Sequence, residues 1–392
     1  MNTESTSFHP IKSALEIERI EAYALASRVD GGPVSTLALM PVRCGLVIKI
    51  TASDGAYGWG EAWCNYPPKG NLAKLSLLRD PIAPALFDAE VSSWHDLRPA
   101  LEKRLCRMMI HTGEWGPFAH CLAALDIAAA DLSARRAGMG LAGFLGAPNA
   151  RNAKVYASSP GTENAEDLAP KLTEDGHTGV KIKIGFDRSG DADVLERFRA
   201  NDKAQMQLFV DANQKWSVGE AASAIAGLEQ FDVSFVEEPI LALAPLSDWK
   251  RLARTAAPPL AAGENITSAA AFKRHVDQQS LGVIQPDVAK WGGISGALDV
   301  GRYALNRGAG CTLHYMGTAV GLAASLHTLG AIGGEGRVEL DANRNPLRTE
   351  LGSIDLKTMD GKVRIPPGEG IGFEPDQEAM HRFSIASEDI RK

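Results

Sequence analysis

The sequence predicts a parallel β/α barrel joined to a smaller α+β domain. From about residue 154 to residue 340, short β-rich runs alternate with Ala- and Leu-rich helical stretches. The runs recur about every 25 residues, the length of one strand, one helix and two short loops. Eight such units predict a closed (β/α)7β-type, TIM-like barrel. The runs are 155–157, 180–184, 208–210, 233–236, 260–262, 281–284, 311–313 and 338–340.

The chain has 392 residues, more than one compact core usually holds, so we expect more than one domain. Residues 46–51 and 56–62 predict a hairpin, because the Asp-Gly pair between them favours a tight turn. Apolar residues at helical spacing predict a helix over 117–145. We expect residues 1–150 to form an α+β capping domain and residues 151–345 the barrel. Residues 346–392 are expected to pack back on the capping domain.

Composition argues against several kinds of partner. A net charge of −7 offers no basic face to nucleic acid or to an anionic membrane. Five cysteines without a C-x-x-C pair argue against a disulfide framework and a structural zinc site. No run of ~20 apolar residues and no signal peptide is readable, so we expect a cytoplasmic protein. We expect a homo-oligomer that acts on a small molecule.

Acidic residues follow three consecutive runs of the predicted barrel, at Asp211, Glu237 and Glu264. The carboxyl ends of barrel strands meet at one rim, where active sites lie. Three carboxylates that point together repel each other unless a cation lies among them. Oxygen ligands alone favour Mg²⁺ over zinc. The alternative is that each carboxylate caps a helix or lies in a loop, which suits one of them better than all three.

Two further pairs suggest proton transfer. Lys181 and Lys183 lie two residues apart on one predicted strand and therefore share a face. A lysine packed beside another cation loses proton affinity and can act as a base near neutral pH. The alternative is an edge strand with solvent-exposed lysines. Asp287 and His314 follow adjacent runs, and a carboxylate on one imidazole nitrogen raises the basicity of the other. A lone histidine there would more often be a core residue.

Glu339 and two loops complete the candidate site. Glu339 follows the last run, and the residues alone leave open whether it is a protonated acid facing substrate or an exposed glutamate. Loops 28–36 and 63–69 are candidates to cover the barrel mouth and select the substrate. Their glycines suit a mobile lid, and Trp63 and Tyr66 could exclude water. The alternative is that both are ordinary exposed loops.

These motifs, taken in order, resemble the enolase superfamily and, within it, the mandelate racemase subgroup. The resemblance covers nearly the whole predicted barrel and part of the capping domain. The segment Tyr-Met-Gly-Thr-Ala-Val after His314 matches no known substrate group. The matching stretches are Gly58-Trp59-Gly60-Glu61, 124–127 through 144–146, Lys181-x-Lys183-Ile-Gly, Asp211-Ala-Asn213-Gln, Val-Glu237-Glu-Pro, Gly-Glu264-Asn265, Pro-Asp287-x-x-Lys290-x-Gly-Gly and His314.

The resemblance implies a role for each matching residue. It implies that Asp211, Glu237 and Glu264 bind Mg²⁺, and a glutamate as third ligand favours the mandelate racemase subgroup over the muconate-cycloisomerase-like one. It implies Lys183 as one acid/base, tuned by Lys181.

On the opposite face, the resemblance implies the His314–Asp287 pair as the second acid/base. Glu339 matches the electrophile that meets the substrate carboxylate, and Asn213 matches a substrate contact. Lys290 keeps the position of the other subgroup's base, and we interpret it here as a cation behind the metal ligands.

The implied reaction is Mg²⁺-dependent removal of the proton next to a carboxylate, giving a metal-stabilised enediolate. That scheme is general to the superfamily and is not specific to this chain. Bases on both faces permit racemisation of a 2-hydroxy acid. They also permit dehydration, when one base takes the proton and protonated His314 helps the β-hydroxyl leave. The resemblance favours a lyase that dehydrates an acid sugar to a 2-keto-3-deoxy acid over a racemase. A metal- and anion-binding barrel without turnover is the third interpretation.

Overall fold

The eight predicted runs form one ring of parallel strands in the computed structural model, which describes residues 15–30, 32–33 and 39–392. The strands pair in the order β10-β9-β8-β7-β6-β5-β4-β11. A parallel bridge between Leu313 and Val338 closes the ring, so the predicted barrel is confirmed. The barrel strands are β4 (Asn152–Ser158), β5 (Gly179–Lys183), β6 (Gln207–Asp211), β7 (Val233–Glu237), β8 (Leu260–Ala262), β9 (Val283–Ile284), β10 (Gly310–Cys311) and β11 (Val338–Asp341).

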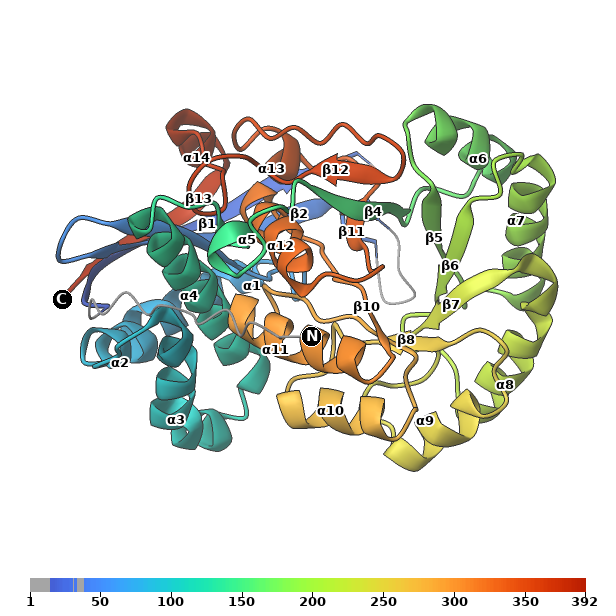
Figure 1. Cartoon of the computed structure of the whole chain (residues 1–392), viewed down its shortest axis with the longest axis horizontal. Helices are drawn as coiled ribbons and strands as arrows, with labels where there is room; N and C mark the ends of the chain where they lie inside the picture. The colour runs from blue at the N-terminus through green and yellow to red at the C-terminus, as the bar shows by residue number, and fades with distance from the viewer. Residues whose placement is uncertain (1–14, 31, 34–38) are drawn as a thin grey trace, which may run out of the picture.

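Helices connect the strands along the outside of the ring (Figure 1). Four of them begin at Asp187, Ser217, Ser268 or Thr318, whose side chains accept hydrogen bonds from backbone N–H groups of the first turn. Each of these helix starts is therefore specified by local sequence. The helices are α6 (Ala165–Glu174), α7 (Arg188–Asn201), α8 (Val218–Gly227), η2 (Glu229–Phe231), α9 (Leu246–Ala253), α10 (Ala269–Asp277), α11 (Gly293–Asn306) and α12 (Ala319–Ile332).

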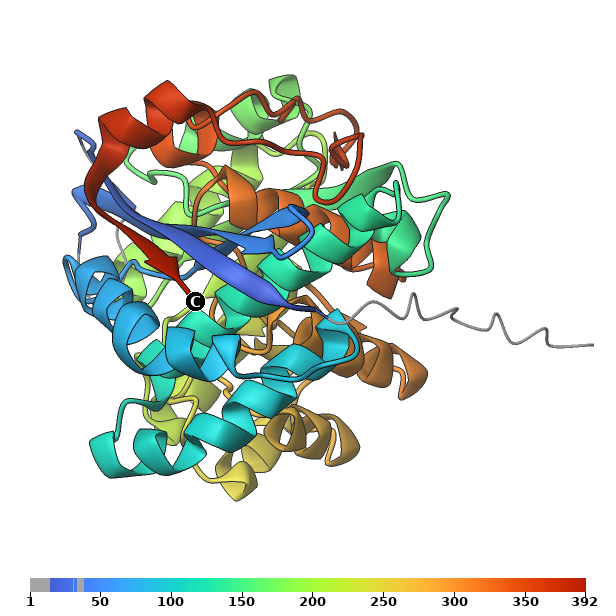
Figure 2. The same cartoon turned by 90° about the vertical axis from the view of Figure 1, so that its left-hand side faces the viewer.

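A four-stranded antiparallel sheet of order β13-β1-β2-β3 forms the base of the capping domain. The predicted hairpin is confirmed as β2 and β3. The last strand, β13, lies beside the first, β1 (Figure 2). The elements are β1 (Ile17–Arg28), β2 (Val42–Ala52), β3 (Tyr57–Ala62), α1 (Gly70–Leu77), η1 (Leu78–Ile82), α2 (Ala83–Phe87), α3 (Trp94–Thr112), α4 (Trp115–Arg136), α5 (Leu141–Phe144) and β13 (Ser384–Arg391).

The tail between the barrel and β13 contacts both domains. It contains α13 (Pro346–Thr349), β12 (Lys362–Arg364) and α14 (Gln377–Phe383). Strand β12 pairs with the barrel strand β4, whereas α14 contacts β1 of the capping domain. The domain boundaries at residues 150 and 345 and the homo-oligomeric state stay predictions. Within the described ranges, no helix is both long and apolar enough to cross a bilayer.

The single helix predicted over 117–145 is wrong, because the structure has two helices there, α4 and α5. Gly138 adopts a left-handed conformation, with φ of 63°. The backbone turns at that point, and Met139 N donates to Ala134 O at 3.0 Å. A left-handed glycine directly after the last helical turn is a common way for a helix to end.

Helix α4 lies between the capping sheet and the barrel (Figure 1). Two glycines on β3 allow the close approach, because a Cβ at Gly58 would lie 2.1 Å from Ala128 O and one at Gly60 would lie 2.0 Å from Ala124 O. On its other side, buried Asp126 accepts hydrogen bonds from Ser295 N at 2.9 Å and Ser295 Oγ at 2.5 Å, near the start of α11. The capping domain is thereby docked on the barrel.

A buried ion pair also joins the two domains. Arg43 on β2 is 2% exposed and donates from Nη2 to Asp341 Oδ2, at the end of β11, at 2.5 Å. Loss of one partner leaves a buried charge without compensation, which costs about 3–5 kcal/mol. We predict that Arg43→Met lowers the free energy of unfolding in urea by that amount. Arg382→Met is the control, because its ion pair with Glu350 is exposed and is worth less than about 1 kcal/mol. Equal losses in the two variants would contradict the prediction.

Candidate active site at the barrel rim

Three carboxylates lie at the ends of consecutive strands. Asp211 on β6 and Glu237 on β7 are partners in register, and both are buried. Glu264 follows β8, with 12% of its side chain exposed. None of the three caps the helix after its strand, since Ser217 and Ser268 cap α8 and α10 and Pro245 occupies the N-cap position of α9. The interpretation of these carboxylates as helix caps is therefore wrong.

Lys181 lies at the centre of the carboxylates and is fully buried. Its Nζ lies 2.7 Å from Glu237 Oε2, 2.9 Å from Glu339 Oε1 and 3.5 Å from Asp211 Oδ2. Its strand β5 lies between β4 and β6 in the ring. The alternative of an edge strand with solvent-exposed lysines is therefore wrong.

Lys183 points to the same side and donates to Asp211 Oδ2 at 2.5 Å. The expected loss of proton affinity beside Lys181 is wrong for this arrangement. Burial and the charge of Lys181 act to lower the pKa of Lys183, but the charge of Asp211 outweighs them and holds that pKa above its ordinary value. A dication bound at Asp211 would cancel the charge that raises the pKa.

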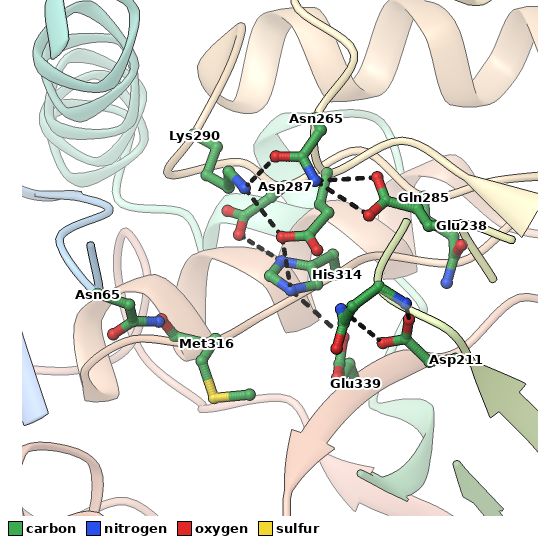
Figure 3. Close-up of polar contacts among 12 residues, drawn as sticks. Asn65, Asp211, Glu238, Asn265, Gln285, Asp287, Lys290, His314, Met316 and Glu339 are labelled. Carbon is green, nitrogen blue, oxygen red and sulfur yellow. Dashed lines mark hydrogen bonds and ion pairs between the residues drawn. The ribbon is translucent and has the colours of Figure 1, made fainter. Parts of the chain in front are cut away.

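His314 lies among three carboxylates, of which Asp287 and Glu339 are labelled in Figure 3. Its Nδ1 lies 2.6 Å from Asp287 Oδ2, and its Nε2 lies 3.2 Å from Glu264 Oε2 and 3.7 Å from Glu339 Oε2. Burial acts to lower the pKa of His314, but Glu264, Glu339 and Asp287 together raise it to about 9. The imidazole is therefore protonated at neutral pH and is held in a fixed orientation by Asp287.

Glu339 is 1% exposed, so its interpretation as an exposed glutamate is wrong. Its Oε1 pairs with Lys181 and accepts a hydrogen bond from Ser158 Oγ. Its Oε2 is buried and has no hydrogen-bond partner among the described residues. Burial acts to raise the pKa of Glu339, but the charges of Lys181 and His314 hold it below its ordinary value. Whether Glu339 faces the substrate as a protonated acid stays a prediction.

The two candidate bases stand on different sides of the barrel mouth. Lys183 ends β5, and His314 follows β10. In one direction around the ring, two strands lie between β5 and β10, namely β4 and β11. In the other direction four strands lie between them, namely β6, β7, β8 and β9. A substrate placed over the mouth can therefore be approached by Lys183 and His314 from different sides.

The sequence motifs did not assign three polar neighbours of the site. Ser158 ends β4 and contacts Glu339. Gln285 Nε2 donates to Glu237 Oε2 at 2.6 Å. Glu238 accepts from Asn265 Nδ2 at 2.9 Å, and burial together with the charge of Glu264 raises its pKa to about 8. Position alone could have found them, since each lies at or just beyond the carboxyl end of a barrel strand.

The predicted substrate contacts border the same rim. Asn213 donates from its backbone N to Asp211 Oδ1 at 2.8 Å. The ring of Trp63 lies over Lys290 Nζ, at 4.4 Å from its centroid, and 6.2 Å from the ring of Tyr66. Asn65 Nδ2 donates to Met316 O at 2.8 Å, which anchors this loop to the segment after His314 (Figure 3). In the other predicted loop, 28–36, residues 31 and 34–36 lie outside the described residues.

The charge of the site fits a divalent cation. Over the described part of the chain, no three acidic, histidine or cysteine groups are grouped to hold an ion, because each proposed ligand pairs with a lysine. Six carboxylates nevertheless face only three lysines and one histidine, so the fully ionised cluster has two negative charges in excess. The carboxylates are Asp211, Glu237, Glu238, Glu264, Asp287 and Glu339, and the cations are Lys181, Lys183, Lys290 and His314.

Consistent with that excess, burial and the charge of Asp211 raise the pKa of Glu237 to about 7. An oxygen-only donor set with two negative charges to neutralise fits Mg²⁺.

Glu61 connects the capping domain to the segment that follows His314. This buried carboxylate on β3 accepts from Thr318 N at 2.8 Å, Thr318 Oγ1 at 2.6 Å and Gly321 N at 2.7 Å, at the start of α12. A Cβ at Gly317 would lie 2.3 Å from Glu61 Oε1. Glu61 therefore holds the short segment between His314 and α12 in place.

Burial raises the pKa of Glu61 to about 7, which gives a testable pH dependence. Between its unfolded pKa, about 4.3, and 7, the native state binds more protons, so its contribution to stability falls as pH rises. We predict that, between these pH values, the free energy of unfolding of the wild type falls by about 3 kcal/mol relative to that of Glu61→Gln. Urea unfolding at several pH values measures this difference. A stability difference between the two proteins that does not change with pH would contradict this assignment.

Comparison with known proteins agrees with the fold. The model "Enolase C-terminal domain-like" matches residues 163–379, and the model "Mandelate racemase / muconate lactonizing enzyme, N-terminal domain" matches residues 29–146. A solved mandelate racemase/muconate lactonizing enzyme from Bordetella bronchiseptica RB50 is 35% identical, with a TM-score of 0.86 over 94% of this chain and 99% of that one.

Two relatives are named for sugar-acid chemistry. The L-talarate/galactarate dehydratase of Salmonella typhimurium is 30% identical over 70% of this chain and 68% of its own. The D-galactarolactone cycloisomerase of Agrobacterium fabrum is 26% identical over 95% of this chain and 99% of its own. Other relatives are epimerases and dehydratases, and structural neighbours include a racemase with bound magnesium. This chain belongs to the enolase superfamily, among its mandelate racemase and muconate lactonizing enzyme members.

Proposed function

We propose that this protein removes the proton next to the carboxylate of an acid sugar and expels the β-hydroxyl, giving a 2-keto-3-deoxy acid. The observation that carries the proposal is the placement of Lys183 and the Asp287-oriented His314 on different sides of one rim, with Glu339 between them. A site that only bound a carboxylate would not need two such groups.

Each residue has a stated part in the reaction. In its neutral form, Lys183 Nζ takes the α-proton, and the electron pair of that C–H bond forms the enediolate. His314 gives its Nε2 proton to the β-hydroxyl, which leaves as water while the enediolate electrons form the C2=C3 bond of an enol. The enol then takes up a solvent proton at C3 and loses its O–H proton to become the ketone. In this proposal the substrate carboxylate binds beside Glu339, and Lys181 is the cation that pairs with Glu339. Mg²⁺, when bound by Asp211, Glu237 and Glu264, would neutralise the negative charge that builds up on the substrate carboxylate.

Two observations bear on the choice of reaction. A protonated His314 suits an acid that helps a hydroxyl leave, and a relative that is 30% identical, from Salmonella, is named a dehydratase. Racemisation of a 2-hydroxy acid is the second candidate, because bases on two sides can deliver a proton to either face of the same carbon.

A screen of acid sugars with Mg²⁺ tests the proposal. We expect at least one to yield a 2-keto acid, and the yield to stop with EDTA. Inversion or α-proton exchange without a keto product would instead support the racemase. Binding of acids that EDTA does not affect, with neither exchange nor product, would support a barrel that binds anions without turnover.

A further inference from the structure

Lys74 is a buried cation that no carboxylate neutralises among the described residues. It lies in α1, directly after the predicted substrate loop, and is 2% exposed. Within the described ranges its Nζ has no ion-pair or hydrogen-bond partner, and this atom is not fully shut off from solvent. A buried ammonium without a partner is costly, and buried charges in proteins are normally paired. An arrangement of this kind points to a negatively charged group that is supplied from outside the chain.

Two more unsatisfied polar atoms lie beside Lys74. Trp63 Nε1 and His120 Nδ1 are buried and have no hydrogen-bond partner in the part of the chain that is described. The rings of Trp63 and His120 meet edge to face at 5.4 Å, and Lys74 Nζ lies 6.0 Å from the Trp63 ring. Burial and the charges of Lys74 and Lys290 hold the pKa of His120 well below its ordinary value. The imidazole is therefore neutral, and its Nδ1 can donate or accept.

This cluster, Lys74, Trp63 and His120, borders the candidate active site. The Trp63 ring that faces Lys74 also lies over Lys290 Nζ, which donates to the proposed metal ligand Glu264 at 2.8 Å. Trp63 N donates to Ala289 O at 3.0 Å, two residues after Asp287. The loop that carries Trp63 is thus fixed to the barrel rim, and both lysines lie near its indole.

We propose that Lys74, Trp63 and His120 form a subsite for a second carboxylate of the substrate, so that the substrate is a dicarboxylic acid. This inference rests on the proposed function, in which the first carboxylate of the substrate binds beside Glu339. A single ammonium is neutralised by a single carboxylate. A phosphoryl group, which carries about −1.5 to −2 charges, would leave net negative charge buried there. The indole N–H supplies a second donor to the same anion.

Matched pairs of acids test the subsite. We would measure the affinity of four- to six-carbon sugar diacids, and of the monoacids that differ only in a terminal hydroxymethyl group, by calorimetry with Mg²⁺. For at least one pair, the wild type should bind the diacid about 10- to 100-fold more tightly, the range expected for a charge-assisted contact. Lys74→Met should remove that preference and leave the monoacid affinity unchanged. Lys103→Met is the control, because Lys103 is an exposed lysine of α3, outside the predicted substrate loop.

The outcomes separate this inference from the proposed function. If no diacid binds more tightly than its monoacid, or if Lys74→Met lowers both affinities equally, the subsite is wrong. Proton exchange in D2O with the same acids tests the reaction independently. Proton exchange with monoacids but with no diacid would support the proposed proton removal and contradict the second-carboxylate subsite. Tighter binding of diacids that depends on Lys74, with neither proton exchange nor keto product, would support the subsite. It would contradict the proposed reaction.

Discussion

Replacement of His314 by Asn and of Lys183 by Ala is expected to abolish α-proton exchange of opposite stereochemistry. Each variant lacks the proton-transfer group on one side of the barrel mouth, and a positioned acid or base contributes about 10²–10⁴-fold to a rate. We therefore expect the rate of α-proton exchange to fall by that factor on the face served by the replaced residue. Exchange on the opposite face should continue. Exchange into each epimer of the acid, followed by ¹H NMR in D2O, measures the effect.

Matched controls separate chemistry from general damage. Lys203→Ala and His111→Asn change exposed residues of the same types and should exchange as the wild type does. His314→Asn keeps a polar side chain beside Asp287, so thermal unfolding should report a folded protein. Full exchange on both faces in both variants would show that Lys183 and His314 are not the two bases.

Loss of one proposed metal ligand is expected to have an equally large effect. Asp211→Asn removes one of three anionic ligands and the contact that holds Lys183. Because a ligand that binds only the native state stabilises it by about 2.7 kcal/mol at 100 times its Kd, the wild type should unfold at a higher temperature with Mg²⁺. We expect Asp211→Asn to lose that shift and about 10³-fold or more of its activity, since the cation contributes several kcal/mol of charge stabilisation.

The control for this variant is Asp193→Asn. The Asp193 carboxylate is 63% exposed on α7 and lies in an ion pair with Arg197. This variant should keep both the Mg²⁺ shift and the activity. A wild type whose unfolding temperature does not respond to Mg²⁺, or an Asp211→Asn variant that responds as strongly, would argue against the proposed metal ligands.

The barrel was predictable because its signals are local. A parallel strand that is buried on both faces is a short apolar run, and the charged group after it marks the rim. Periodicity and spacing alone therefore predicted that Asp211, Glu237, Glu264, Asp287 and His314 gather at one end of the barrel. The two-residue spacing predicted that Lys181 and Lys183 point the same way.

What could not be predicted depends on contacts between distant parts of the chain. Glu61 and Thr318 are 257 residues apart, so no spacing rule relates them. The pKa of Lys183 follows the nearer charge, Asp211, rather than its neighbour Lys181. Lys74 resembles an ordinary surface lysine in a short helix, because lysines are rarely buried, and only the packing around it reveals that it is buried. The end of α4 at Gly138 was obscured because the apolar spacing continues into α5.

Solvent deuterium incorporation tests the central claim most directly. The wild type, with Mg²⁺ in D2O and a panel of acid sugars, would be compared with a variant that combines Lys183→Ala and His314→Asn. The proposal predicts that deuterium enters the carbon next to the carboxylate of at least one acid, or C3 of its 2-keto-3-deoxy product, where the enol takes up a solvent proton. It also predicts that EDTA or the double substitution stops this incorporation. Incorporation that persists in the double variant, or none with any acid that binds, would contradict proton removal at this rim.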